Sequence, residues 1–486
     1  GSARREILGR LFPKQRERLA ALLRAEGADA LTQVDDPGLE RALTALLVAL
    51  RRYRLYGDAG GFSAADLAVL HAAQQAAKES GEPADRAAID AVCDALKTPA
   101  ARRARSRFQQ LSATLTAKAV GDAAFYRYGR LLSRNEVGSG PGRLAIPVEA
   151  FHAAACRRQI DFPHAMLATA THDHKRGEDS RMRLAVLSAL PGAWSDFVTR
   201  RCARHESPEA SVQAMIYQSL VGAWPLDLQP NDAPGVAALG ARLQPWLTKA
   251  LREAKQKTSW HDPNEAFERE CAGFLEGLLT SPAFLTEAAA FVARIAPAGA
   301  VNGLAQALLR LTMPGIPDLY QGTELWDFSL VDPDNRRPVD FAARARALAD
   351  DLPFGDLLRN WRDGRVKQAL IARLLRFRRR HPELLAAGSY APLRASGSMI
   401  AFARRLGSDA LIVAVPRLVT DADPVGLTLP AQVLRESVTI PAELVGAAGT
   451  DLLTARKVTL PKAIGAAELL DVAPVAALQV RVRPTD

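Results

Sequence analysis

"ATATHDHKRGEDSR", residues 168–181, joins a run of small residues to a dense group of charges. The apolar residues from 165 to 172 are typical of a short buried strand, which ends at His172 and Asp173. In a (β/α) barrel each strand is followed by a loop and a helix, and active-site residues lie at the carboxyl ends of the strands. The stretch therefore predicts a barrel strand at 165–172 with a functional site at its end.

Two other stretches repeat this pattern of an apolar run followed by polar residues. Residues 111–120, "LSATLTAKAV", precede an aromatic and charged segment, and residues 313–325, "MPGIPDLYQGTEL", lead into the polar loop 326–340. Each run is rich in small, apolar or β-branched residues, as strands are. A complete barrel needs eight such strands, so three strands predict a partial (β/α)8 TIM barrel of the α/β class.

The rest of the chain divides by its hydrophobic periodicity. Helical spacing of apolar residues dominates 3–110 and 181–299, whereas short alternating runs separated by turn residues fill 388–486. We expect five regions: a helical region at 3–110, two barrel strands with their loops at 111–180, a helical insertion at 181–299, a third strand with closing helices at 300–387, and an antiparallel β-sandwich domain at 388–486.

Composition and charge narrow the class of protein. The chain has 486 residues and a net charge of +10, with 24% charged residues. The basic clusters at 101–107 and 376–380 lie within helical patterns, so solvated helix faces are favoured over phosphate-binding patches. We expect no nucleic-acid partner.

The cysteines and the apolar runs favour a cytoplasmic protein. The cysteines at positions 93, 156, 202 and 271 lie far apart, and none belongs to a C-x-x-C motif, which argues against a disulfide scaffold or a zinc site. No apolar run approaches the ~18 residues that span a bilayer, and no signal peptide or phosphate-binding glycine motif is recognisable. We expect no cofactor, no metal and no membrane partner.

Three stretches together resemble one enzyme family. They are 107–138, "RFQQLSATLTAKAVGDAAFYRYGRLLSRNEVG", 168–181, and 315–341, "GIPDLYQGTELWDFSLVDPDNRRPVDF". They are similar to the maltooligosyl trehalose synthases of glycoside hydrolase family 13, the α-amylase superfamily. The resemblance covers almost the whole chain, and it implies that the three predicted strands are barrel strands 6, 7 and 8.

The resemblance also implies a reaction. These enzymes are isomerases that convert the reducing-end α-1,4 linkage of a maltooligosaccharide into an α,α-1,1 linkage by intramolecular transglucosylation with retention. Retaining glycosidases use a nucleophilic carboxylate and an acid/base carboxyl group ~5–5.5 Å apart. The superfamily adds a third carboxylate and a histidine after the seventh strand, and Asp173 and His172 match that pair.

The resemblance makes Asp173 a catalytic residue and His172 a substrate-binding residue. Hydrogen bonds to sugar hydroxyls that tighten as the ring flattens stabilise the transition state preferentially. From the residues alone, an ion-paired Asp173 that caps the following helix is the alternative. The other substrate-binding candidates are Lys118, Tyr126, Tyr128, Lys175, Arg176, Arg336 and Arg337.

Each of these candidates has a structural alternative. Lys118 and Lys175 could be solvated loop lysines, and Tyr126 and Tyr128 could pack in the interior instead of stacking on sugars. Arg336 and Arg337 belong to a loop that salt bridges could hold in shape. Glu324 is expected to be structural, and Trp326 is either a stacking platform or a core residue.

Several parts of the family pattern are missing or changed. The nucleophile motif G-x-R-x-D, the acid/base Glu and the early Asp-x-x-x-Asn-His motif do not occur, and in the family all three precede the part that this sequence matches. Gly121 replaces the family's Glu, and His174 stands where Thr is usual. We therefore expect a C-terminal portion that is inactive alone and needs the N-terminal part of the barrel.

Two alternatives stay open at this point. The chain could belong to another α-glucan hydrolase or transglucosylase of the α-amylase superfamily, or it could be a non-catalytic glucan-binding fragment that needs a partner.

Overall fold

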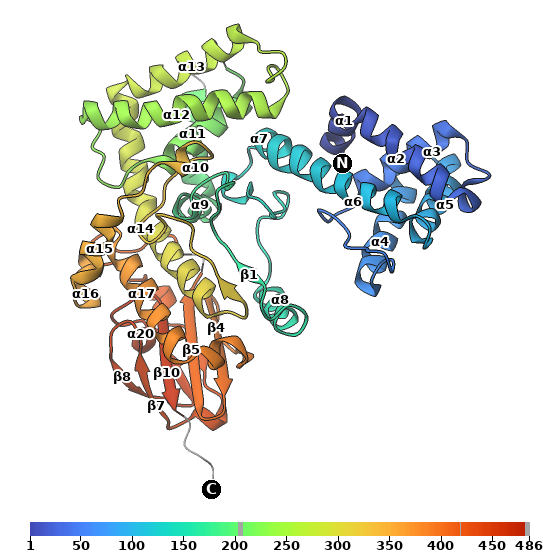
Figure 1. Cartoon of the computed structure of the whole chain (residues 1–486). Helices are drawn as coiled ribbons and strands as arrows, with labels where there is room; N and C mark the ends of the chain where they lie inside the picture. The colour runs from blue at the N-terminus through green and yellow to red at the C-terminus, as the bar shows by residue number, and fades with distance from the viewer. Residues whose placement is uncertain (203–207, 418, 482–486) are drawn as a thin grey trace. The chain divides into compact units, whose positions relative to one another are not determined.

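The computed structural model describes residues 1–202, 208–417 and 419–481 (Figure 1). The chain forms two compact units. Unit 1 contains residues 1–127 and 252–262, and unit 2 contains residues 128–251 and 263–486.

Unit 1 is built from helices, as the sequence predicts for 3–110. They are α1 (Ser2–Leu11), α2 (Pro13–Glu26), α3 (Asp36–Ala49), α4 (Ala64–Ser80), α5 (Arg86–Lys97), α6 (Arg102–Thr116), the π-helix η3 (Ala117–Ala124) and α7 (Phe125–Arg127). Helix α4 begins with a capping interaction, because Ser63 Oγ accepts a hydrogen bond from the Asp66 N–H at 3.1 Å and donates one to the Asp66 carboxylate at 2.8 Å. Leucines and alanines of these helices bury a continuous core.

The prediction of a strand at 111–120 is wrong, because α6 and η3 cover these residues. Ala104, Phe108, Leu111, Leu115 and Ala119 are all buried, and they recur at intervals of three and four residues. This spacing places them on one face of a helix. A strand would also need a neighbour to pair its backbone groups, and none pairs with this stretch among the described residues. Lys118 therefore lies on a helix and not at the end of a strand.

The helices of unit 2 form two groups around a long central one. Before the centre lie α8 (Val148–Asp161), α9 (Glu178–Ala185), α10 (Pro191–Cys202), α11 (Ala210–Ala223), α12 (Ala233–Ala254) and α13 (Glu265–Leu279). The central helix is α14 (Pro282–Thr312), and it is followed by α15 (Phe341–Ala349), α16 (Phe354–Arg359), α17 (Arg365–Arg380) and α18 (Pro382–Ala386). Figure 1 shows α14 (yellow) running from the α10–α13 group to the C-terminal sheet.

Helix α14 corrects the sequence prediction about apolar runs. It has 31 residues with a mean hydropathy of 1.3 in its most apolar 18-residue window, and 67% of that window is buried. By length and composition it could cross a membrane. A core helix of this length has the same composition, since it is apolar on all sides.

The strands predicted at 165–172 and 313–325 do pair, but over only two residues each. β1 (Met166–Leu167) lies parallel to β2 (Ile316–Pro317), with Met166 opposite Ile316. Both of these side chains are exposed. The backbone after β1 continues as a loop into α9, which is the order that the barrel pattern predicts.

The C-terminal region folds as an antiparallel β-domain. Its six-stranded sheet has the order β3-β4-β5-β10-β7-β8, and β6 pairs with β9 in a second, two-stranded sheet. The elements are β3 (Ser389–Leu393), β4 (Met399–Leu406), β5 (Asp409–Pro416), α19 (Ala431–Leu434), β6 (Ser437–Thr439), β7 (Ala448–Asp451), β8 (Lys457–Thr459), β9 (Ala463–Gly465), α20 (Ala466–Leu469) and β10 (Ala476–Arg481).

Antiparallel strands are present in 388–486, as expected from the short alternating runs of the sequence. The β4–β5 hairpin turns at Gly407, which has a positive φ of 57°. The run 425–430 is not a strand, because it lies between Pro424 and Pro430 and begins in a turn in which the Asp423 carboxylate accepts from the Val425 N–H at 2.8 Å. The final predicted strand ends at Arg481, and its last two residues lie outside the described residues.

Candidate active site

The site predicted at the end of β1 is a tight loop, which we call the 168–177 loop. The Thr171 hydroxyl accepts a hydrogen bond from the Asp173 N–H at 3.2 Å, and the Thr171 carbonyl accepts one from the His174 N–H at 3.3 Å. Side-chain oxygens of threonine often fix turns in this way. The turn directs His172 and Asp173 outward and His174 inward, since the first two are exposed and the third is buried.

Asp173 presents a carboxylate at the tip of this loop. Its side chain is 52% exposed, and Lys175 Nζ lies 3.3 Å from its Oδ1. The side chain of Lys175 is only 3% exposed, so its ammonium group contacts the carboxylate from the protein interior. The predicted alternative of a helix cap is not seen, since α9 begins after Gly177 and has no side-chain cap.

The polar loop after β2 braces the 168–177 loop. The carbonyl of His172 accepts hydrogen bonds from Asn335 Nδ2 at 3.2 Å and from Arg336 Nη2 at 3.1 Å. Gly177 donates its N–H to the carbonyl of Ser329 at 2.7 Å. A Cβ at position 177 would lie 2.4 Å from the carbonyl oxygen of Asp327, so only glycine permits this approach. The two stretches that carry the family resemblance are therefore in contact.

Arg337 stays within its own loop, as the structural alternative predicted. Its Nε lies 2.9 Å from Asp334 Oδ1, and Arg242 Nη2 lies 3.0 Å from the other oxygen of that carboxylate. Asp332 pairs with Lys249 at 2.6 Å. Burial would raise the pKa of Asp332, but the hydrogen bond from Lys249 lowers the pKa below its ordinary value. These pairs hold the loop in shape.

Glu136 is a residue that the sequence prediction missed. It is buried, and its carboxylate accepts the N–H of Lys175 at 3.0 Å and that of Arg176 at 3.4 Å. It also lies 3.5 Å from Arg181 Nε. A buried acid that accepts backbone N–H groups fixes the path of the chain. Glu136 belongs to "SRNEVG", at the end of the stretch 107–138 that resembles the family. No chemical feature of the sequence distinguishes it from the other acids.

His174, the departure from the family's Thr, is buried in the core of the loop. Its Nδ1 accepts from the Thr171 N–H at 3.3 Å, so the proton lies on Nε2, which donates to Ser329 Oγ at 2.9 Å. Its ring meets that of Tyr320 edge to face at 5.8 Å. Burial lowers the pKa of His174 below its ordinary value, and the neutral ring fits these partners.

A buried charge network lies at the start of α9. Lys367 of α17 is fully buried, with its Nζ 2.6 Å from both Glu178 Oε1 and Asp179 Oδ2. Arg310 of α14 lies 2.6 Å from the other oxygen of Glu178 and also contacts Thr169. Burial raises the pKa of Asp179, and the Lys367 and Arg310 cations outweigh burial in lowering that of Glu178. The network joins α9, α14 and α17 to the end of β1.

A cavity of about 300 Å³ lies at the loop after β2, and none of its lining residues belongs to the 168–177 loop. Its lining includes Tyr320, Trp326, Asn335 and Arg337. Trp326 lines this cavity and is partly buried; its Nε1 donates to the Trp361 carbonyl at 2.6 Å, and Lys367 lies 5.7 Å from its ring centre. Glu324 pairs with Arg344 at 3.0 Å, as a structural residue would.

Of the remaining candidates, Lys118, Tyr126 and Tyr128 lie outside the 168–177 loop. Lys118 pairs with Asp122 at 2.8 Å on the exposed side of η3, and Tyr126 is 5% exposed in the core of unit 1. Tyr128 belongs to unit 2, where its ring is 37% exposed and its carbonyl accepts from Asn135 Nδ2 at 2.7 Å. Arg176 lies in the 168–177 loop but is 1% exposed, and its backbone bridges to Leu330.

Thiols and metal-binding groups do not contribute a site in the described part of the chain. No three His, Cys, Asp or Glu side chains there are grouped as metal ligands would be. Cys93 and Cys156 are free thiols, Cys271 is buried, and the side chain of Cys202 lies outside the described residues.

Comparison with known proteins places this geometry in a class. No protein-family model matches the chain. The similar solved structures define a fold like that of glycoside hydrolase family 13, with a sheet-rich C-terminal part. They cover 99% of this chain.

The proteins behind these matches share one name. A protein of Mycobacterium tuberculosis that carries the provisional name of maltooligosyl trehalose synthase is 42% identical over 316 residues, which is 64% of this chain and 38% of that protein. A mutant of maltooligosyltrehalose synthase from Arthrobacter ramosus has a TM-score of 0.79 and 35% identity, and this chain covers 58% of it. Another crystal structure of a maltooligosyl trehalose synthase has a TM-score of 0.74 and 26% identity. The resemblance predicted from the sequence is confirmed, and the chain spans between a third and three fifths of the length of these relatives.

Proposed function

We propose that this chain is the C-terminal portion of a maltooligosyl trehalose synthase and supplies Asp173 as the carboxylate that grips the reacting sugar. Its α-1,4-glucan substrate would be rearranged at the reducing end to an α,α-1,1 linkage. One observation carries the proposal. Of the three acids in 168–181, Glu178 and Asp179 are buried against cations, whereas Asp173 is half exposed at the tip of a braced loop.

The loop geometry suits that role. A carboxylate that stabilises an oxocarbenium-like transition state must be ionised, exposed to the ligand and fixed in place before the ligand arrives. Lys175 lies beside the carboxylate, and three side chains hold the backbone: Glu136 at the Lys175 N–H, and Asn335 and Arg336 at the His172 carbonyl. Arg336 therefore serves as a positioning residue in this proposal, and so does Lys175, whose side chain is 3% exposed against the Asp173 carboxylate.

We further propose that the chain needs the N-terminal part of the barrel for catalysis. Retention requires a nucleophile and an acid/base group ~5–5.5 Å apart, and the family motifs for both are absent from these 486 residues. Because the exposed edge at Met166 and Ile316 belongs to a two-stranded sheet, further barrel strands would find backbone groups to pair with there. In the cell we expect a cytoplasmic location.

Incubation of the chain with maltohexaose tests this proposal. The chain alone should leave the number of reducing ends unchanged, and addition of an N-terminal fragment of the same gene product should make reducing ends disappear as trehalose termini form. A rise in reducing ends would indicate a plain hydrolase instead. Brisk activity of the chain alone would refute the requirement for the N-terminal part.

A substitution in the complete enzyme tests the proposed role of Asp173. In the complete enzyme, Asp173→Asn should lower kcat by at least about a hundredfold, since one oxyanion- or charge-stabilising group contributes ~10²–10³ in rate. Asp161→Asn, an exposed acid in the preceding helix α8, is the matched control and should retain full activity. Equal activity of the two variants would remove Asp173 from the site.

A further inference from the structure

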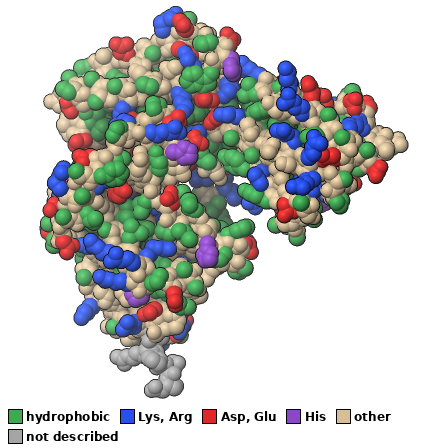
Figure 2. Space-filling model, in the orientation of Figure 1, with side chains coloured by type: hydrophobic (Ala, Val, Ile, Leu, Met, Phe, Trp, Pro, Cys, Tyr) green, Lys and Arg blue, Asp and Glu red, His purple; other side chains and the backbone are tan. Residues whose placement is uncertain are grey.

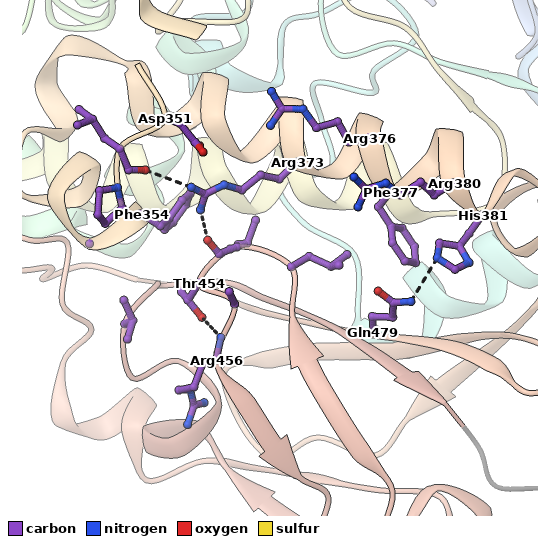
Figure 3. A pocket seen from close by; sticks show the side chains of 17 residues that line it. Asp351, Phe354, Arg373, Arg376, Phe377, Arg380, His381, Thr454, Arg456 and Gln479 are labelled. Carbon is purple, nitrogen blue, oxygen red and sulfur yellow. Dashed lines mark hydrogen bonds between the residues drawn. The ribbon is translucent and has the colours of Figure 1, made fainter. Parts of the chain in front are cut away.

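A second and larger cavity of about 910 Å³ lies between α17 and the C-terminal β-domain (Figure 3). One wall is formed by α17, and the opposite wall by the turn after β7 and by Gln479 of β10. None of its lining residues belongs to the 168–177 loop or to the loop after β2. Nothing in the proposed glucan chemistry uses it.

The charge of this cavity is strongly positive. Its charged lining consists of four arginines and one acid: Arg373, Arg376, Arg380, Arg456 and Asp351. Two of the arginines are engaged by neutral carbonyl groups, since Arg373 contacts the carbonyls of Leu453 and Leu352, and Arg456 contacts that of Glu468. A carbonyl partner fixes a guanidinium without neutralising it, and the acids whose charges act on Arg373 are Asp351 and Asp451.

The two other arginines of the cavity, both on α17, have no described partner. Among the described residues, Arg376 and Arg380 have no ion pair and no hydrogen bond from their side chains, and both are exposed. With Arg373 they are spaced by three and four residues, which places all three on one face of the helix. Figure 2 shows Lys and Arg side chains gathered on the surface over α17 and the β-domain.

The aromatic residues of the cavity argue against a sugar. Carbohydrates bind to exposed ring faces, but Phe354 and Phe377 are 3% and 4% exposed. Arg373 lies over the ring of Phe354 at 5.3 Å, and His381 stacks on Phe377 at 4.6 Å. Both rings are therefore covered by cationic or polar neighbours, which leaves guanidinium groups as the chemistry that the cavity offers.

We propose that this cavity binds a phosphate-bearing anion, held by Arg376 and Arg380 and oriented by the fixed charge of Arg373. The planar fork of a guanidinium matches phosphate oxygens in geometry and charge. The volume is within the range of small-ligand sites. An anion here would also relieve the repulsion among three like charges on one helix face. The proposal is independent of the glucan site.

Calorimetric titration of the 486-residue chain tests the proposal. In a chloride buffer free of sulfate, the probes are inorganic pyrophosphate, glucose 1-phosphate and, as the neutral comparison, glucose. We expect saturable binding of at least one of the two phosphate compounds and none of glucose. Arg376→Ala and Arg380→Ala should each weaken it about tenfold, the loss of one charge-assisted contact. The matched control is Arg379→Ala, which removes the same charge from the same helix outside the cavity and should change the affinity less than about twofold.

The outcomes separate the possible ligands. Tighter binding of pyrophosphate would identify an inorganic polyanion, whereas tighter binding of glucose 1-phosphate would identify a phosphorylated sugar. If all three substitutions weaken phosphate binding equally, the binding depends only on the overall positive charge of the helix. This result would overturn the proposed site. The proposal also fails if neither phosphate compound binds at millimolar concentration, or if maltoheptaose binds and loses affinity in Arg380→Ala. Because every substituted side chain is exposed, the variants should fold, and their circular dichroism verifies this.

Discussion

Residues 111–124 and residues 165–177 both join small and β-branched residues to charged ones, and only the second stretch contains a strand. The first continues α6 as a π-helix, whereas the second pairs with Ile316–Pro317 and then turns. Their charged groups differ as well. Lys118 makes an exposed pair with Asp122, one turn away on its own helix, but Lys175 packs under Asp173 in a loop held from three other segments. The loop that we propose as the site is therefore distinguished by the segments that hold it in place, which a short stretch of sequence does not reveal.

The largest loss of stability should come from substitution of Lys367, which is fully buried and pairs with the two acids that follow the 168–177 loop. Lys367→Met leaves Glu178 and Asp179 buried without their shared cation. Breaking a buried ion pair on one side costs about 3–5 kcal/mol, so the free energy of unfolding in urea should fall by that amount. Lys457→Met, at an exposed strand position, is the control and should change it by less than ~0.5 kcal/mol. A small loss at Lys367 would mean that the network does not support the loop.

Gly177 should give the next largest effect. Gly177→Ala forces a Cβ against the carbonyl of Asp327, so the 168–177 loop and the loop after β2 must separate. We expect a loss of about 1–3 kcal/mol, as for other overpacked sites, and loss of the hydrogen exchange protection of the Gly177 N–H. Gly140→Ala, where a Cβ meets no atom within 4 Å, is the matched control. Equal stability of the two variants would contradict the close contact between the loops.

The burial of His174 in the 168–177 loop should make the stability of the folded protein depend on pH. The unfolded chain protonates this histidine near pH 6.5, whereas burial lowers its pKa in the folded protein. Between these two pKa values the unfolded state binds more protons, so the stability contributed by His174 is lost as the pH falls below about 6.5, by up to ~1.4 kcal/mol per pH unit.

The measurement is a comparison of two proteins at two pH values. The stability difference between the wild type and His174→Thr should shift in favour of the variant from pH 7.5 to pH 5.5, in thermal or urea unfolding. Because His152 is also buried with a lowered pKa, it contributes a slope of the same sign to both proteins, which the difference cancels. A difference independent of pH would show that His174 is solvated and the loop open.

The sequence predicted the class of fold and named Asp173 as a candidate, but not the parts that depend on distant partners. The helices of unit 1 and the antiparallel strands of the C-terminal region follow from local patterns, whereas the contact between 168–181 and the loop after β2 does not. Glu136, Asn335 and Lys367 were missed because each acts by contacting backbone or charges far away in the chain. The strand assigned to 111–120 failed for the opposite reason, since β-branched content was weighed above helical spacing.

Substitution of Gly121 should change the stability least, and it tests directly whether residues 111–124 form a helix or a strand. It lies in η3, and a Cβ built on it meets no atom within 4 Å. Gly121→Ala should therefore stabilise unit 1 by about 0.5–1 kcal/mol, because alanine is the better helix former by that amount. In a strand the same change would bring no such gain, since alanine is a poor strand former. The matched variant Gly121→Val separates the two cases further: β-branching disfavours a helix and favours a strand. If Val stabilises unit 1 more than Ala does in urea unfolding, then residues 111–124 form a strand in solution, and the contrast with residues 165–177 disappears.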